Sequence, residues 1–337
     1  MSAALKNKKV LVTGADGFIG SHLTECLVSA GAHVTALAQY NSFGSNGWLD
    51  DISEDLRARI RLRRGDIRDP NFVKGLVNDQ EIIFHLAALI AIPFSYQAPQ
   101  TYVDVNLTGT LNVLEAARYS NVKRIVHTST SEVYGTAQCT PITEAHPLHA
   151  QSPYAASKVA ADMMSEAYAR SFGLQVFILR PFNTYGPRQS ERAVIPTIIR
   201  QALDPACDVI RLGDLTPKRD FNFVSDTVKA FMSAGSADGL DPGVAYNAGS
   251  GDAVSIGEIV EMVQSLSGVN KPVEQESERL RPANSEVFEL IASAENFETQ
   301  SGWSPVTGLE EGLARTIEWW RSRIRQADIR RDRDYLV

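Results

Sequence analysis

The chain has 337 residues, of which 44% are hydrophobic, and a formal net charge of −7. This length and composition exclude a disordered chain, and the negative charge argues against wholesale nucleic-acid binding. Three cysteines at unrelated spacings predict neither a disulfide framework nor a metal site. Residues 1–9 lack a secretory signal, and the most apolar segment, 81–94, is too short to span a bilayer, so we expect a cytoplasmic protein without membrane insertion.

Short β-branched runs alternate with longer amphipathic stretches through the first half of the chain. This rhythm is typical of βαβ units around a parallel sheet. We expect strands at 9–13, 33–37, 60–63, 82–85, 124–128 and 175–179, and helices at 18–29, 70–77, 101–119 and 152–172. Beyond Pro181 the rhythm fades, and segments rich in proline and glycine at 184–188 and 213–217 predict loops and short helices that form a lid, without another layered sheet.

Three glycines, Gly14, Gly17 and Gly20, lie between the first expected strand and the first expected helix. They permit a tight turn, close approach of a pyrophosphate and close helix–strand packing, while the helix N-terminus favours an anion. Isolated glycines often form only a structural turn, but their place between strand and helix predicts a dinucleotide site. The acid expected about 20 residues later is missing, since Tyr40 and Asn41 follow the second strand, and no arginine stands there. We therefore predict NAD and leave NADP open.

Strand, glycine turn and helix in this order predict an α/β fold, a Rossmann-type doubly wound parallel sheet with a smaller, mostly C-terminal substrate-binding lobe. We assign residues 1–181 and about 220–248 to the dinucleotide-binding domain, and residues about 182–219 and 249–337 to the lobe. The order of the elements places Asp66 near the adenine. The alternative for Asp66 is an aspartate that only solvates a loop.

Tyr154 and Lys158 lie four residues apart, so both project from one face of a helix. A phenol with a pKa of about 10 is a poor base, but a neighbouring ammonium favours the phenolate, which can then deprotonate a sugar hydroxyl. Such a pair is often mere helix decoration. Here it follows a strand whose end, Thr128 to Glu132, carries hydroxyls and a carboxylate at the edge where open α/β sheets bind ligands.

The irregular second half contains the candidate substrate contacts. Arginine forks there can grip a diphosphate bidentately, although a single arginine is more often a solvated surface residue. Arg219 and Arg281 are the strongest candidates, Arg281 because residues 279–286 resemble a ribose- and phosphate-facing segment of nucleotide-sugar enzymes. The full set of predicted substrate contacts is Ser129, Asn183, Arg188, Arg192, Val194, Arg219 and Arg281.

Several motifs occur together along most of the chain: the glycine turn, His85-Leu-Ala-Ala88, Asn106, Thr130-Ser-Glu132, Tyr154-x-x-x-Lys158, Arg180-Pro-Phe-Asn183-x-Tyr-Gly-Pro187-Arg188 and Arg219-Asp-Phe-x-Phe-Val224. In these motifs the chain resembles the extended short-chain dehydrogenase/reductases that modify nucleotide sugars. The triplet at 130–132 resembles that of sugar 4,6-dehydratases, and residues 91–96 resemble those of the legionaminic-acid type of pathway. The resemblance implies a homodimer formed through the helices at 101–119 and 152–172.

The motifs and this resemblance together supply the expected site. Thr130, Ser131, Glu132, Tyr154 and Lys158 are the expected catalytic residues. The expected cofactor contacts are Gly14, Gly17, Phe18, Ile19, Gly20, Tyr40, Asn41, Asp66, Ile67, Leu86, Ala87, Ala88, Asn106, Thr128, Tyr154, Lys158 and Pro181.

Glu132 determines which reaction is expected. If Tyr154 takes the proton of the sugar 4-hydroxyl during oxidation at C4, the ketone acidifies C5, and Glu132 can remove that proton before water leaves C6. Hydride return then gives a 4-keto-6-deoxy sugar, and the tightly bound dinucleotide is recycled. Thr130 is expected to hydrogen-bond near O4, and Ser131 stands where some dehydratases carry an aspartate. The expected substrate is a nucleotide-linked N-acetylhexosamine used in polysaccharide biosynthesis.

Two other functions are weighed against dehydration. A 4-epimerase or a uronic-acid decarboxylase can use the same fold. Epimerases usually carry a small residue in place of Glu132, which argues against an epimerase, whereas decarboxylases also use a Ser-Glu pair, so the triplet alone does not determine the reaction. A non-catalytic dinucleotide sensor would explain the glycine turn, but it leaves Thr130, Glu132, Tyr154 and Lys158 jointly unexplained.

Overall fold

The computed structural model describes residues 2–280, 282 and 285–325. Its strands are β1 (Lys9–Thr13), β2 (His33–Gln39), β3 (Arg61–Gly65), β4 (Ile82–His85), β5 (Arg124–Thr128), β6 (Val176–Pro181), β7 (Asn183–Tyr185), β8 (Ile210–Leu212), β9 (Lys218–Phe223), β10 (Ala245–Ala248), β11 (Ala253–Ser255), β12 (Val273–Gln275) and β13 (Glu289–Leu290). Its α-helices are α1 (Ser2–Leu5), α2 (Phe18–Ser29), α3 (Glu54–Arg57), α4 (Pro70–Val77), α5 (Ile92–Gln97), α6 (Pro99–Tyr102), α7 (Gly109–Arg118), α8 (Pro153–Phe172), α9 (Val194–Leu203), α10 (Val224–Ala234), α11 (Ile256–Ser267), α12 (Glu295–Ser301) and α13 (Leu309–Arg325). Short 3₁₀ segments are η1 (Gly47–Asp51), η3 (Ser131–Tyr134) and η4 (Ser277–Arg279), and η2 (Val103–Thr108) is π-helical.

Parallel strands form the central sheet in the order β10-β6-β5-β4-β1-β2-β3. The strand order reverses between β1 and β4, and this is where a doubly wound sheet binds its ligand. Thr13 of β1 lies between Leu37 of β2 and His85 of β4. The predicted α/β fold with a Rossmann-type sheet is therefore confirmed, and the predicted bounds of β1, β4, β5, α2 and α4 agree with the structure.

Alternate residues of the strands supply two separate cores, one on each face of the sheet. Val12 packs in one core with Leu23 of α2 and Phe231 of α10. Leu11, its neighbour in the chain, packs in the other with Val113 of α7. Because successive strand residues point to opposite faces and both faces are covered, the strands are continuous apolar runs. Burial of each such side chain contributes roughly 1.5–3 kcal/mol.

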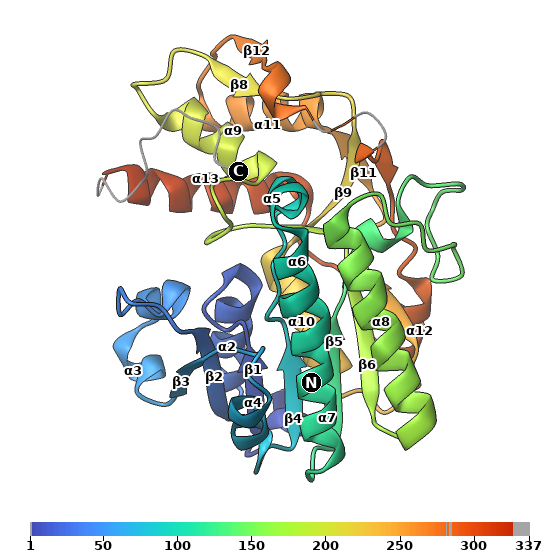
Figure 1. Cartoon of the computed structure of the whole chain (residues 1–337). Helices are drawn as coiled ribbons and strands as arrows, with labels where there is room; N and C mark the ends of the chain where they lie inside the picture. Colours follow the sequence, from blue (N-terminus) through green and yellow to red (C-terminus); the bar gives the residue numbers. More distant parts are fainter. Residues whose placement is uncertain (1, 281, 283–284, 326–337) are drawn as a thin grey trace.

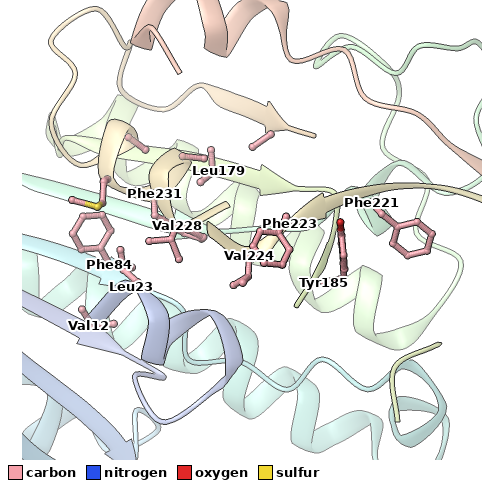
Figure 2. Close-up of a cluster of buried hydrophobic side chains, with 14 of the residues drawn as sticks. Val12, Leu23, Phe84, Leu179, Tyr185, Phe221, Phe223, Val224, Val228 and Phe231 are labelled. Carbon is pink, nitrogen blue, oxygen red and sulfur yellow. The ribbon is translucent and has the colours of Figure 1, made fainter. Parts of the chain in front are cut away.

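The first core continues from the sheet into the lobe. Figure 2 shows buried side chains that lead from Leu179 of β6 through Val224 to the aromatic rings of Phe223, Tyr185 and Phe221. There the Tyr185 ring packs edge-on against Phe221 and Phe223, with centroids 6.2 and 5.5 Å away. This apolar continuity holds the lobe against the end of the sheet.

The lobe contains more regular structure than the sequence predicts. Both β7 and β13 pair in parallel with β9, β11 pairs with it antiparallel, and β8 pairs with β12. The helices α9, α11 and α13 pack together over one end of the central sheet (Figure 1). The prediction of a lid without another sheet is therefore wrong, because strands of two to six residues are too short to give a clear periodic signal.

The chain returns to the central sheet after β9. The helix α10 packs on α2, and β10 pairs with β6. The return to the central sheet therefore lies between β9, which ends at Phe223, and α10. The later helix α12 also packs against β10. No helix in the described ranges is long and apolar enough to cross a membrane.

Candidate active site

A cleft of about 1260 Å³ lies between the carboxyl ends of the central strands and the lobe. Common small-molecule sites enclose about 300–1,000 Å³, so this cleft has room for two ligands. The turns after β1, β4, β5 and β6 line it on one side, and β9 and the start of α9 on the other. The predicted site residues that line it are Gly14, Gly17, Phe18, Ile19, Gly20, Asp66, Ile67, Leu86, Ala87, Ala88, Thr128, Ser129, Thr130, Ser131, Glu132, Tyr154, Lys158, Pro181, Asn183, Arg188, Arg192, Val194 and Arg219.

The glycine turn is built as its spacing predicts. Gly14 has a φ of +66°, and a Cβ there would lie 2.7 Å from the backbone nitrogen of Ala87. A Cβ on Gly20 would lie 2.1 Å from the Gly14 carbonyl oxygen, so neither position accepts a side chain. The helix α2 begins after Gly17 without a side-chain cap. The N–H groups of its first turn can therefore bind a phosphate.

The start of α8 fixes Tyr154 and Lys158, the predicted catalytic pair. The Ser152 hydroxyl accepts a hydrogen bond from the backbone N–H of Ala155, and Pro153 occupies the first turn, where its missing N–H costs nothing. Tyr154 and Lys158 follow one turn apart, both line the cleft, and they are 7% and 4% exposed. The predicted shared helical face is therefore present.

Burial dominates the protonation of this pair. It raises the pKa of Tyr154; a hydrogen bond with Thr130 lowers that pKa, and the charge of Glu132 raises it further. The net effect of these groups disfavours the phenolate. Burial also lowers the pKa of Lys158 to about 8, and its ammonium donates a hydrogen bond of 2.6 Å to the Thr128 carbonyl.

The segment after β5 brings the predicted catalytic triplet to the cleft. The Thr130 hydroxyl caps η3 by accepting a hydrogen bond of 3.2 Å from the backbone N–H of Glu132. Ser131 is buried and Glu132 is half-buried, and both line the cleft. The Glu132 charge acts on Tyr154, which places the carboxylate within electrostatic reach of the phenol. The short helix therefore turns one hydroxyl and one carboxylate toward the same pocket.

A buried charge cluster behind Lys158 was not foreseen from the sequence. Asp162 lies one turn further along α8 and is fully buried. It accepts hydrogen bonds from Ser129 at 2.7 Å and from the guanidinium of Arg180 at 3.0 and 3.1 Å, and His127 Nε2 lies 3.3 Å away. The Asp162 charge partly offsets the burial effect on the pKa of Lys158. Its i, i+4 spacing from Lys158 was the available signal.

Asn106 acts behind the cleft wall and does not line it. Its side-chain amide donates to the Leu89 carbonyl and to the Ser157 hydroxyl at 2.9 Å each, and its Oδ1 accepts from the Leu89 N–H at 2.8 Å. These bonds join the turn after β4 to α8. Asn106 therefore supports the wall of the cleft, and its contact with the cofactor stays a prediction.

The end of the cleft beside β2 differs most from expectation. Tyr40 is 71% exposed, and the side-chain amide of Asn41 is bonded to the Ser45 carbonyl at 2.8 Å; neither residue lines the cleft. Asp66 does line it, and the guanidinium of Arg68 lowers the pKa of its carboxyl. Three lining residues that the sequence reasoning missed are Asp16, Trp48 and Arg323.

The lobe side of the cleft contains arginines that are already paired. Arg188 donates to Glu25 at 2.6 Å, and Arg219, which is 6% exposed, donates to Glu286 at 2.9 Å. The Asn183 amide donates to the Asp220 carbonyl at 3.4 Å. These partners fix the side chains that face the cleft. The predicted contact at Arg281 lies outside the described residues.

The residues that line the cleft fit a dinucleotide. The bare N-terminus of α2 offers N–H groups for its diphosphate, and the side-chain-free approach at Gly17 leaves room for it. Tyr154 and Lys158 of α8 line the same cleft, together with residues that follow β5. The remaining space borders Asn183, Arg192 and Arg219, where a second, anionic ligand fits.

Comparisons with known proteins agree with this site. A family model described as GDP-mannose 4,6 dehydratase matches residues 11–316. A UDP-glucose 4-epimerase of Mycolicibacterium smegmatis is 33% identical over 94% of this chain and 99% of its own, and a dTDP-glucose 4,6-dehydratase of Actinoplanes sp. is 33% identical over 93% and 98%. The solved structure of DesIV, a dTDP-glucose 4,6-dehydratase of Streptomyces venezuelae with NAD and TYD bound, has a TM-score of 0.84 and 30% identity over 94% of this chain and 98% of its own.

The fold and the site define an extended short-chain dehydrogenase/reductase. Within that class the chain belongs to the GDP-mannose 4,6-dehydratase family, whose members are NAD-dependent enzymes that act on nucleotide sugars. The predicted recognition and the predicted NAD cofactor are confirmed. Epimerases and dehydratases are equally similar to this chain, so identity alone does not choose between their reactions.

Proposed function

We propose that this protein is a nucleotide-sugar 4,6-dehydratase. The observation that carries the proposal is the carboxylate of Glu132, which lines the cleft and acts electrostatically on the phenol of Tyr154. An epimerase needs an acid–base group only at the sugar 4-hydroxyl. A dehydratase needs a second base for C5, and Glu132 supplies one beside the first.

Tyr154 is the base for the 4-hydroxyl. The hydrogen bond from Thr130 favours its phenolate, and Lys158, whose pKa of about 8 leaves it protonated at neutral pH, holds positive charge nearby. When bound, NAD would supply hydride transfer from C4 and back to C6, and it would therefore be recycled without being consumed. The Thr128 carbonyl orients the Lys158 ammonium, which keeps it from swinging into solvent.

Glu132 removes the C5 proton once C4 is a ketone. The adjacent Ser131 hydroxyl is the group that can assist departure of the C6 hydroxyl, with Glu132 returning the proton it has taken. Proton and hydroxyl leave together as water. Once hydride has added to C6, Glu132 passes a solvent proton to C5 and Tyr154 releases the proton of the 4-hydroxyl to solvent, so the product is a 4-keto-6-deoxy sugar. The substrate diphosphate is assigned to Arg192 and Arg219, which line the far side of the cleft.

A panel of nucleotide sugars, with N-acetylhexosamine nucleotides included, tests this proposal by mass spectrometry. We expect a product lighter than its substrate by one water, without added NAD being consumed. An unchanged mass with inverted C4 would replace dehydration by epimerisation, and loss of carbon dioxide from a uronic-acid substrate would replace it by decarboxylation.

Tyr154→Phe and Thr130→Val separate the base from the hydrogen bond that supports it, in the same assay. Removal of the phenol hydroxyl should abolish oxidation at C4 itself, with a fall in kcat of roughly 100- to 10,000-fold. Thr130→Val, which is nearly isosteric, should weaken catalysis less because it removes a hydrogen bond to the base and leaves the base in place. Equal losses in both variants would contradict these roles.

A further inference from the structure

The ribose-binding acid of the Rossmann fold has no counterpart at the end of β2. In such folds an Asp or Glu at that point binds the adenosine 2′-hydroxyl. Here the strand ends at Gln39, Tyr40 points into solvent, and the Asn41 side chain is bonded within its own loop. A chain that uses NAD therefore needs another group for this hydroxyl.

A carboxylate from the glycine turn reaches the same point. Asp16 precedes Gly17, and its Oδ2 accepts a hydrogen bond of 3.1 Å from the backbone N–H of Gln39, the last residue of β2. Both residues line the cleft. The carboxylate of Asp16 thus lies at the strand end where the acid of other dinucleotide-binding folds is found, although it arrives from a different segment of the chain.

The segment η1 holds Asp16 in this position from the other side. The Asp16 carbonyl accepts a hydrogen bond of 3.0 Å from the Trp48 N–H. A Cβ on Gly47 would lie 2.4 Å from that carbonyl oxygen and 3.1 Å from the Asp16 Cβ, so the two segments are in close contact. Asp16 is therefore fixed between β2 and η1 before any ligand binds.

The charges around Asp16 disfavour an additional phosphate. Asp50 and Asp51 line the cleft beside it. Of the nearby cations, Arg323 donates to Asp51 at 2.6 Å, and Arg64 donates to Asn46 at 2.8 Å and to the Gly44 carbonyl at 3.2 Å. Each guanidinium is thereby held by other protein partners, and the carboxylate of Asp16 is the charge that lies at the end of β2 itself.

We infer that Asp16 replaces the missing acid of β2: its carboxylate accepts the hydrogen bond of the adenosine 2′-hydroxyl of NAD and repels the 2′-phosphate of NADP. This assignment concerns cofactor choice alone. It holds for any reaction of the family, so its failure would be distinct from failure of the proposed dehydration.

Binding measurements test the hydroxyl contact without turnover. Isothermal titration calorimetry should show that the wild-type protein, freed of bound dinucleotide, binds NAD⁺ roughly 10- to 100-fold more tightly than its 2′-deoxyadenosine analogue. Asp16→Ala should bind both with nearly equal affinity. The loss of the Asp16–Gln39 bond weakens every dinucleotide alike, so only a contact with the hydroxyl makes the two ligands converge.

The charge is tested with Asp16→Asn, which keeps the shape and the bond to Gln39. Its preference for NAD⁺ over NADP⁺ should shrink at least about 10-fold relative to wild type, because one negative charge facing the phosphate is gone. Asp55→Asn, on α3 outside the cleft lining, is the matched control and should leave the preference unchanged. Circular dichroism and Tm verify the fold of each variant.

Three results would overturn the assignment. One is a wild-type protein that binds the 2′-deoxy analogue as tightly as NAD⁺, which needs no variant at all. Another is a folded Asp16→Ala variant that still binds NAD⁺ more tightly than the 2′-deoxy analogue. The third is a Gln39→Ala variant that loses this preference while Asp16→Ala retains it.

Discussion

At the scale of a single residue, the role that we propose for Glu132 separates dehydration from plain oxidation. We predict that Glu132→Gln retains NAD and nucleotide-sugar binding, because the residue changes neither size nor position, but loses roughly 100- to 10,000-fold in kcat for dehydration. Exchange of the C5 hydrogen with deuterated solvent, followed by mass spectrometry, measures the affected step directly. Glu132→Asp, which keeps a shorter carboxylate, should restore part of the exchange. Full dehydration by the Gln variant would refute the assigned role.

His127 makes the fold sensitive to acid. Burial lowers the pKa of His127 to about 4, from about 6.5 in an unfolded chain. Above pH 6.5 both states are neutral; between pH 6.5 and 4 the unfolded chain binds a proton that the folded protein does not, so the free energy of unfolding falls by roughly 3 kcal/mol as the pH is lowered. Denaturant unfolding of His127→Asn should show a shallower fall over this range than wild type. The same slope in both proteins would contradict the prediction, and His33→Asn, at an exposed imidazole, is the control.

At the scale of elements, the N-terminal cap of α8 positions the catalytic pair. Ser152→Ala removes the bond to the Ala155 N–H and should lower the free energy of unfolding by about 1 kcal/mol. Since Tyr154 follows two residues later, the first turn should also fray and kcat should fall modestly. The comparison variant is Ser120→Ala, because the Ser120 hydroxyl donates to the Ala117 carbonyl and caps no helix start. Denaturant unfolding should show a smaller loss of unfolding free energy for Ser120→Ala than for Ser152→Ala. An unchanged stability of Ser152→Ala would mean that helix packing alone fixes this turn.

The elements of the first half were predictable because each carries a local signal. Strand and helix periods, the glycine turn and the cap-proline pair before α8 all act within a few residues. The predicted helix at 101–119 is instead a succession of α6, η2 and α7, in which Asn106 of the π-helical turn bonds to Leu89 and Ser157. Such an interruption depends on partners distant in sequence, which local periodicity does not encode.

The candidate site was predictable for similar reasons, and its gaps have the same cause. Residues in a motif, such as Tyr154 and Glu132, reach the cleft because the carboxyl ends of parallel strands share one edge. Asp16 was passed over because its role depends on the end of β2, and Asp162 because its partners come from β5 and β6. The lobe strands could not be predicted because they are too short to show a periodic pattern and are stabilised by pairing with strands distant in sequence.

At the scale of the whole molecule, the face formed by α7 and α8 favours a homodimer. These helices pack together, and Val103, Met163 and Phe172 leave large apolar side chains 41%, 43% and 46% exposed on or beside them. We predict a dimer by size-exclusion chromatography with light scattering. Met163→Arg should shift it toward the monomer by placing a charge in an apolar interface, whereas the distant Val306→Arg should not. A wild-type monomer at micromolar concentration would contradict the prediction.

We propose that C4 is oxidised only transiently and that its hydrogen returns to C6. A nucleotide sugar labelled with deuterium at C4 tests this transfer, with the product analysed by NMR. Dehydration by this route should give a 4-keto-6-deoxy product that carries the label at C6 and solvent hydrogen at C5. A product that retains the label at C4, with the C6 hydroxyl still present, would contradict it and establish an epimerase.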